Sequence, residues 1–370
     1  MKDLLKDIGT KKILIVSGII VGVIVFIIIA LKLFNSMFAG TSYSKIESTM
    51  VSAARKYYEK NPKMLPQMSG GVVNISSTNL TSNGHMKDLN EYTKKIDGSL
   101  SCTGSVSVTN IEGQYRYTPS LNCGDKYKTT TLVGYVRDHE PLVITGQGLY
   151  ELNGGYVFRG DAPNNYVRFA NHLWYITKIY DDYAYLMLAD RANYRSVWDD
   201  RYNVERGSNT GINDYQVSRM RTYLENLYNS EELFTSSDKM LLTPYTLQVG
   251  NRALSQTAND GSIEGSVTIE NSYIGILPAY DYINASIDTS CVSTESNSCT
   301  NYNYMSYFDF AWWLSTGNSE STHQAYKVNL GTLDFGMANQ DSRVLPVVRL
   351  VKDALYVSGD GTKDNPYVIK

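Results

Sequence analysis

The longest uninterrupted apolar stretch lies near the N-terminus, where residues 13–31 hold 19 residues without a charge. As a helix this stretch rises about 28 Å, close to the roughly 30 Å hydrocarbon core of a bilayer. Lysines precede it, so the positive-inside rule places the N-terminus in the cytoplasm. We therefore expect a cytoplasmic tail at 1–12 and a transmembrane signal-anchor at 13–34, with the lipid bilayer as partner. A signal peptide cleaved at a small-residue site near 37–40 is the alternative, but the apolar run exceeds the usual length of such a segment.

A GxxxG pair, Gly18 and Gly22, lies inside this apolar stretch. Two small residues at this spacing let two membrane helices approach closely, which predicts a homo-oligomer. The alternative is that two glycines occur by chance in a β-branched apolar helix.

The pattern changes after residue 42. Residues 43–60 place Ile46, Met50, Ala53 and Tyr57 on one face of an amphipathic helix. Residues 102–123 alternate apolar and polar positions around Glu112-Gly113, which predicts a β-hairpin.

The C-terminal half predicts a second, larger domain. We expect a polar linker at 131–152 and a mixed α+β domain at 153–370, with consecutive short strands and one strong helix over 214–228. The segment 307–317 alternates Phe308, Phe310 and Trp312 with other residues, which is typical of a strand with an apolar face. We expect these rings to form core, and a sugar-stacking platform is the alternative.

The cysteine count indicates an oxidising environment. All of Cys102, Cys123, Cys291 and Cys299 follow the apolar stretch. An even count in an exported segment predicts two disulfides with three connectivities, and proximity in sequence favours 102–123 and 291–299. No CxxC pair is present, which argues against zinc.

The amino-acid composition restricts the classes of partner that the protein can bind. The net charge is −3 and the chain has 30 tyrosines. We therefore expect no nucleic-acid partner, which needs a basic face. Tyrosine joins an apolar ring to a polar tip, which suits wet surfaces and half-buried strands. Together with the apolar segment, this predicts a single-pass membrane protein with extracellular domains.

The N-terminal layout resembles that of type IV pilins and pseudopilins: an apolar helix, an amphipathic helix and a small disulfide-stapled antiparallel sheet. The resemblance implies a pilin-like domain at 43–130. The family's processing glycine and fifth-position glutamate are absent, because Lys12 precedes Ile13 and the run carries no acid. We therefore expect a stalk on a stable anchor, and a minor component of a surface filament is an alternative.

Several motifs of the second half occur together in order: "NNYVRFANHLWYITKI", Trp198 with its Asp pair, "SRMRTYLENLY", "IGILPAYDYINAS", "WWLST", "RVLPVVRL" and "GDGTKDNPYVI". Over residues 153–369 the chain resembles an uncharacterised domain of Firmicute cell-surface proteins. That family is distantly similar to formylglycine-generating enzymes and C-type-lectin-like domains, which implies a lectin-like head. The enzymes need a close copper-binding cysteine pair, and Cys291 and Cys299 stand too far apart in sequence.

Two sets of residues are candidates for binding. The first is a cluster of carboxylates and amides that could ligate calcium, although such residues also cap helices and turns: Asp199, Asp200, Asn209, Asn213 and Asp214. The second is a group of surface tyrosines that could contact a glycan or a protein: Tyr202, Tyr215, Tyr280, Tyr302 and Tyr304.

No catalytic motif is recognisable, and only His172 and His323 occur in the predicted head. We therefore expect a non-enzymatic binding or adhesion head on a pilin-like stalk, with no cofactor beyond the calcium candidate. An exported enzyme with an unknown reaction in the C-terminal domain is the alternative.

Overall fold

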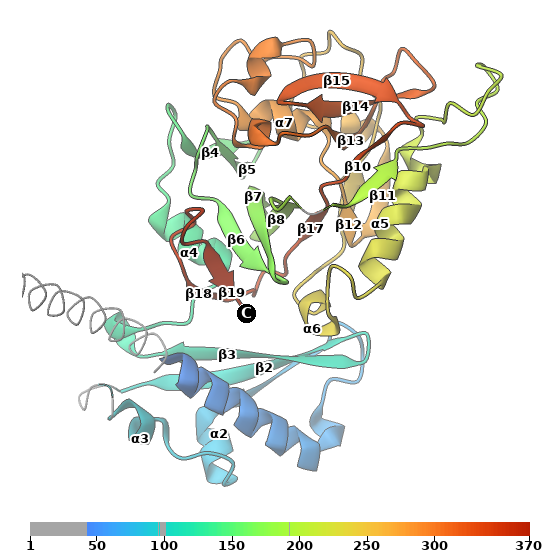
Figure 1. The fold of residues 1–370 in the computed structure, drawn as a ribbon. Helices are drawn as coiled ribbons and strands as arrows, with labels where there is room; N and C mark the ends of the chain where they lie inside the picture. The colour runs from blue at the N-terminus through green and yellow to red at the C-terminus, as the bar shows by residue number, and fades with distance from the viewer. Residues whose placement is uncertain (1–42, 95, 97–100, 192) are drawn as a thin grey trace, which may run out of the picture. The chain divides into compact units, whose positions relative to one another are not determined.

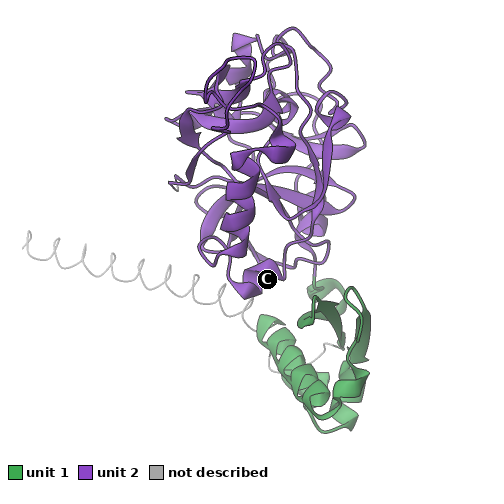
Figure 2. Cartoon of the chain, turned by 90° about the vertical axis from the view of Figure 1, so that its right-hand side faces the viewer, with its two compact units in different colours: residues 1–129 green, residues 130–370 purple. Residues whose placement is uncertain are grey.

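The computed structural model describes residues 43–94, 96, 101–191 and 193–370. The chain divides into two compact units, residues 1–129 and residues 130–370 (Figure 2). Strands dominate the described residues and form four sheets (Figure 1).

The predicted fold class is wrong, because it included a membrane-spanning helix. Within residues 43–370, in so far as they are described, no helix is both long and apolar enough to cross a bilayer. The helical residues 43–60 carry charges such as Lys45 and Glu47, which interrupt any apolar window. The same finding overturns the predicted single-pass membrane localisation. The tail at 1–12, the anchor at 13–34 and the Gly18–Gly22 pair lie outside the described residues.

Unit 1 packs a helix against a small sheet. The helical residues 43–60 bury Ile46, Met50, Ala53 and Tyr58, each at most 4% exposed. The predicted face is therefore correct except that Tyr58, and not Tyr57, is fully buried. The elements that follow are η1 (Pro62–Met64), β1 (Val72–Ser76), α2 (Ser77–Ser82), α3 (Leu89–Thr93), β2 (Thr103–Ile111), β3 (Gln114–Asn122) and η2 (Gly124–Lys126).

The predicted β-hairpin is present as β2 and β3. They pair antiparallel around Glu112 and Gly113, both of which adopt positive φ as a two-residue hairpin turn requires. Val106 and Val108 of β2 are fully buried. The Cys102–Cys123 disulfide closes the open end of the hairpin, and the second predicted pair, Cys291–Cys299, is also bonded.

Unit 2 contains the larger core, and its strands form sheets of nine, five and two. Its first elements are α4 (Leu132–His139), β4 (Gly148–Leu152), β5 (Gly155–Arg159), β6 (Tyr166–Phe169), β7 (His172–Tyr180), β8 (Tyr183–Leu188), β9 (Arg195–Val197), η3 (Tyr215–Val217), α5 (Arg219–Asn229) and α6 (Ser236–Lys239). The rest are β10 (Tyr245–Gln248), η4 (Glu264–Ser266), β11 (Thr268–Ser272), β12 (Ile274–Gly275), α7 (Ala279–Ala285), η5 (Asn297–Thr300), η6 (Tyr304–Tyr307), β13 (Trp312–Gly317), β14 (Gln324–Asn329), β15 (Thr332–Met337), β16 (Asp341–Arg343), β17 (Val347–Arg349), β18 (Tyr356–Ser358) and β19 (Tyr367–Ile369).

The nine-stranded sheet runs β12-β17-β8-β7-β6-β19-β18, with β5 joining β7 and β4 joining β5. The five-stranded sheet runs β15-β14-β13-β16-β9, and β10 pairs with β11. Helix α7 contacts β5 of the larger sheet and β13 of the smaller one (Figure 1). It therefore joins the two sheets in the region where the cavity described below is formed.

The segment assigned as a linker, 131–152, belongs to unit 2 and is largely structured. It supplies α4 and β4, and Leu132, Val133 and Val136 enter the core of that unit. Helix α4 has only 8 residues and three buried positions. Such a short apolar face among polar residues does not give a recognisable helical periodicity in the sequence. The boundary between the units lies at residues 129 and 130.

The aromatic segment at 307–317 belongs to the core as predicted: Phe308 is buried in it, Phe310 packs against it, and the residues from Trp312 onward form a buried strand. All six residues of β13 are buried, and Trp312 and Trp313 are 0% exposed. The strand pairs with β14 and β16 along its two edges, and because its side chains alternate between the faces of the sheet, their burial shows that both faces are covered. It begins later than the alternation predicted, because η6 ends at Tyr307, which is exposed, and residues 308–311 lie in neither a helix nor a strand.

We predict that Trp312→Ala lowers the free energy of unfolding of unit 2 by about 3–5 kcal/mol, because it leaves a large cavity in the core. Urea denaturation followed by fluorescence of the remaining tryptophans measures this loss. A variant within about 1 kcal/mol of wild type would contradict the assignment of Trp312 to the core.

We predict that Cys102→Ser with Cys123→Ser destabilises unit 1 by roughly 3 kcal/mol, since the bond closes a separation of 21 residues. Hydrogen exchange of unit 1 peptides measures this loss. All four tryptophans lie in unit 2, so their fluorescence serves as an internal control. Equal destabilisation of both units, or no change in exchange, would contradict a local role for the bond.

Candidate functional site

A cavity of about 360 Å³ opens within unit 2. Its lining comes from segments far apart in sequence: the β4–β5 turn, β7, β8, β10, the loop after β10, and α7. A pocket of this volume is at the lower end of the range that small molecules occupy in proteins.

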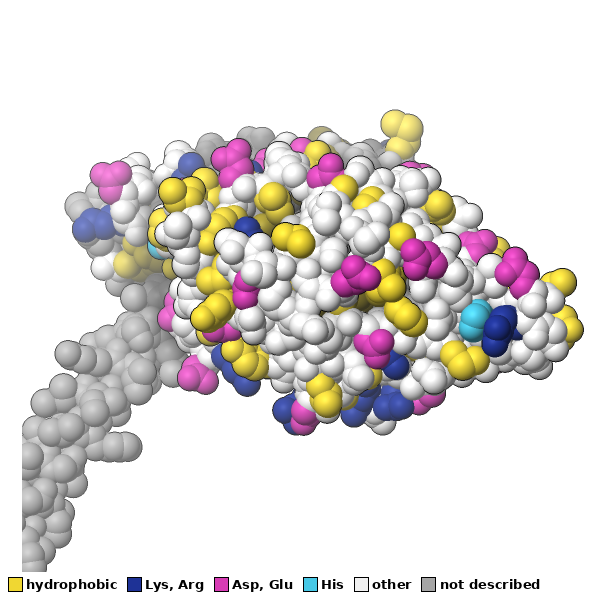
Figure 3. All heavy atoms as spheres, turned by 90° about the horizontal axis from the view of Figure 1, so that it is seen from above, with side chains coloured by type: hydrophobic (Ala, Val, Ile, Leu, Met, Phe, Trp, Pro, Cys, Tyr) yellow, Lys and Arg dark blue, Asp and Glu magenta, His cyan; other side chains and the backbone are white. Residues whose placement is uncertain are grey.

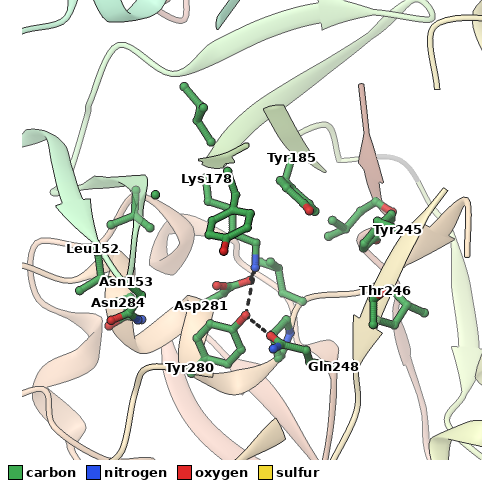
Figure 4. A pocket seen from close by; sticks show the side chains of 18 of the residues that line it. Leu152, Asn153, Lys178, Tyr185, Tyr245, Thr246, Gln248, Tyr280, Asp281 and Asn284 are labelled. Atoms are coloured by element: carbon green, nitrogen blue, oxygen red, sulfur yellow. Dashed lines mark hydrogen bonds and ion pairs between the residues drawn. The ribbon is translucent and has the colours of Figure 1, made fainter. Parts of the chain in front are cut away.

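A lysine and an aspartate meet at the centre of the cavity (Figure 4). Lys178 Nζ lies 2.8 Å from Asp281 Oδ2 and 3.1 Å from the Tyr280 hydroxyl. The Asp281 side chain is 6% exposed and that of Lys178 is 23% exposed.

A β-bulge aims Lys178. The pairing of β7 with β8 changes register between Ile176 and Lys178, so that Lys178 faces Tyr185. An extra residue in one strand re-aims the side chains that follow it. The bulge therefore explains how a charged residue occurs in a strand whose other central residues are buried.

The partner residues come from the first turn of α7. Tyr280 and Asp281 are consecutive residues of this turn. The backbone N–H of Asp281 donates to the Pro278 carbonyl. The Ala279 N–H donates to Thr316 Oγ1 of β13, which fixes the start of the helix. Helix α7 thus presents a phenol and a carboxylate to the same ammonium.

The ion pair controls the charge state of the cavity. Burial, the largest single effect, lowers the pKa of Lys178, but the charges and hydrogen bonds of Asp281 and Tyr280 together outweigh it and the net pKa is raised. Burial raises the pKa of Asp281, and the Lys178 ammonium opposes that rise. At neutral pH the cavity therefore holds an ammonium whose charge a neighbouring carboxylate compensates.

The phenol of Tyr280 extends the polar network. It accepts from Lys178 and donates to Gln248 Oε1. Burial, followed by the charge of Asp281, raises the pKa of Tyr280, so the phenol keeps its proton at neutral pH. The chain from Lys178 through Tyr280 to Gln248 is therefore a fixed set of donors and acceptors.

Tyrosine rings form the sides of the cavity. The Lys178 ammonium lies 5.3 Å from the ring centre of Tyr185 and 5.2 Å from that of Tyr280. Tyr245 meets Tyr185 edge to face at 5.4 Å and donates its hydroxyl to the Val347 carbonyl. The rings are thus held in place by cation–π and aromatic contacts.

A second ion pair shapes the loop that carries Asp260. Arg252 and Glu264 have fully buried side chains and make two hydrogen bonds, of 2.9 and 3.1 Å. The same guanidinium donates to the carbonyls of Gln256 and Ala258. The loop is therefore wrapped around Arg252, and Asp260 lines the cavity from its outer turn.

Of the five candidate tyrosines, only Tyr280 lines the cavity. Tyr202 and Tyr302 are more than half exposed elsewhere on unit 2, while Tyr215 and Tyr304 are core residues. The pattern of tyrosines could not separate these environments. A charged residue inside an apolar strand, Lys178 in "HLWYITKIY", was the signal that sequence reasoning missed.

The residues of the calcium candidate have other partners. Asp199 is buried and pairs with Arg201 at 2.8 Å, and Asp200 pairs with Arg219. The remaining contacts belong to loops and caps: Asn213 donates to the carbonyls of Asn318, Ser321 and Gln324, Asp214 caps η3, and the Asn209 carbonyl accepts from Asn339. Among the described residues, no group of three or more His, Cys, Asp or Glu could hold a metal.

The two histidines of the predicted head lie in separate local contacts. His172 Nδ1 lies 2.9 Å from Asp190, and His323 Nδ1 lies 3.0 Å from Ser321 Oγ. Neither residue lines the cavity. The chemistry of the cavity is therefore that of Lys178, Asp281 and the tyrosines.

Comparisons of the chain with protein-family models, with curated proteins and with solved structures found no match. The resemblances to pilins and to the Firmicute surface domain stay predictions.

We predict that Asp281→Ala lowers the free energy of unfolding of unit 2 by about 3 kcal/mol, because it leaves the Lys178 ammonium without its counter-charge. Urea denaturation followed by tryptophan fluorescence measures the loss. The matched control is Lys178→Met with Asp281→Leu, which removes both charges and costs less than the single change. An equal or greater loss in the double variant would contradict the pairing argument.

Proposed function

We propose that unit 2 is the non-enzymatic binding domain of an exported protein and that it takes a small polar ligand in the cavity around Lys178 and Asp281. The observation that carries the proposal is a cavity of about 360 Å³ whose centre is a compensated ion pair and whose sides are tyrosine rings. Two disulfides support an extracellular setting, since such bonds persist in oxidising compartments.

The cavity is preorganised for binding. The polar groups of its central network, Lys178, Gln248 and Tyr280, stand on β7, β10 and α7 and are joined to one another by hydrogen bonds. Side chains fixed before the ligand arrives lose little freedom on binding, which favours affinity.

On the one face seen in Figure 3, the distribution of side chains favours a recessed site over a flat one. On the face of the molecule seen in Figure 3, hydrophobic side chains are interspersed with polar surface and with charges of both signs. A flat protein-docking site needs a larger contiguous apolar area. The cavity concentrates aromatic and polar groups in one place.

The chemistry of the cavity favours binding over catalysis. The raised pKa of Lys178 keeps the amine protonated, so it is a poor nucleophile. The raised pKa of Tyr280 keeps the phenol from acting as a base at neutral pH. An exported enzyme therefore remains the less favoured alternative.

Unit 1 lies outside the proposed binding function. Its three-stranded sheet, helical residues 43–60 and disulfide form a small separate unit. A role as a pilin-like stalk or as a component of a surface filament stays a prediction.

The test is a thermal-shift screen of the full-length protein against sugars, amino acids, organic acids and nucleosides. We expect at least one class to raise the melting temperature, and Tyr280→Phe to weaken that ligand by about tenfold, because it removes the hydroxyl between Lys178 and Gln248. Tyr202→Phe, at an exposed tyrosine outside the cavity, is the matched control. Conversion of the ligand to a product would favour the enzyme alternative, and equal binding by Tyr280→Phe would place the site elsewhere.

A further inference from the structure

We infer that the cavity of unit 2 binds a neutral carbohydrate and that Tyr180 at its rim stacks on a sugar ring. The inference rests on the proposed binding function and names its ligand class. Three features of the lining carry it: the balance of charge, the mixture of free donors and acceptors, and an exposed aromatic ring.

The balance of charge disfavours a charged ligand. Lys178 is the cation of the lining, and Asp281 already neutralises it at 2.8 Å. An anion would have to displace Asp281, whereas a cation would meet the Lys178 ammonium between the Tyr185 and Tyr280 rings. Asp260 is exposed, so water and salt screen its charge, and its Oδ1 already accepts from Ser262. The charges at the centre therefore leave no net attraction for either sign.

The polar residues that line the cavity offer both hydrogen-bond donors and hydrogen-bond acceptors. Within the described residues, Asp281 Oδ1 and Asn284 Oδ1 accept no hydrogen bond, and Gln248 Nε2 donates none. These three atoms lack a hydrogen-bond partner among the described residues but are not buried, so a ligand can reach them. A hydroxyl group can donate to the first two and accept from the third. A ring that carries several hydroxyls matches this mixture better than a ligand with one kind of group.

Tyr180 supplies the aromatic surface. It is the last residue of β7, lines the cavity and is 47% exposed. Gly155 of the neighbouring strand permits its position, since a Cβ on Gly155 would lie 2.9 Å from Tyr180 Cδ2. A large ring left exposed at the edge of a cavity that also presents polar groups is suited to the C–H face of a sugar.

The Tyr180 ring is not part of the core of unit 2. Tyr180 pairs with Tyr183 at the end of the β7–β8 hairpin, through backbone contacts that do not need the phenol. Its side chain can therefore be removed without opening the core, which separates a loss of binding from a loss of folding.

The test is isothermal titration calorimetry of the full-length protein with three matched sets of sugars. The neutral set holds glucose, galactose, mannose, N-acetylglucosamine and their β-1,4-linked oligomers. The cationic set holds glucosamine, and the anionic set holds glucuronic acid. We expect a neutral sugar to bind and the charged analogue of the same ring to bind at least about tenfold more weakly.

Two variants locate the site. Tyr180→Ala should weaken the neutral sugar by about tenfold or more, whereas Tyr202→Ala, an exposed tyrosine outside the cavity, should leave its affinity unchanged. If the affinity rises with oligomer length, the natural ligand is a polysaccharide chain. If the affinity does not change with length, the natural ligand is a free sugar.

The outcomes separate the two proposals. Tighter binding of a charged analogue that Tyr280→Phe weakens would overturn the inference that the sugar is neutral and leave the binding site in place. Neutral-sugar binding that Tyr180→Ala does not weaken would overturn the stacking role. No heat and no thermal shift with any class of compound would overturn both the ligand class and the proposed function.

Discussion

The ion pair between Lys178 and Asp281 is the contact on which the cavity depends. Each charge is costly to remove from water, and each is tolerated because the other lies 2.8 Å away. The pair joins β7 of the nine-stranded sheet to α7, which also contacts β13 of the five-stranded sheet. It therefore ties the nine-stranded sheet to the five-stranded sheet where the cavity forms, and it sets the electrostatics of that cavity.

Local features of the fold could be predicted from the sequence. The Glu112-Gly113 turn and the Cys102–Cys123 bond follow from residues close together in the chain, and so does the buried face of residues 43–60. The core position of Trp312 was predictable because large apolar rings are rarely left in water. What failed was the extension of an N-terminal hydropathy signal to the whole fold class and to the localisation: among residues 43–370 as described, no helix could cross a bilayer.

The cavity could not be predicted, because it depends on contacts between distant residues. Lys178 and Asp281 are 103 positions apart, and Tyr280 and Gln248 are 32 apart. Tyrosines have the same side chain in the core and at the surface, so Tyr215 and Tyr280 looked alike until tertiary packing separated them. Likewise, a carboxylate such as Asp199 reads as a metal ligand in sequence, while the fold supplies Arg201 as its partner.

The central claim is that the cavity holds a protonated lysine already neutralised by its neighbour. The most direct measurement is the ¹⁵Nζ resonance of Lys178, assigned by its absence from Lys178→Met and followed by NMR from neutral to alkaline pH. We expect an ammonium that keeps its proton past the ordinary lysine pKa of about 10.4, because the neighbouring Asp281 and Tyr280 stabilise the charged form. Loss of the proton at or below that pH, with the protein still folded, would contradict the account.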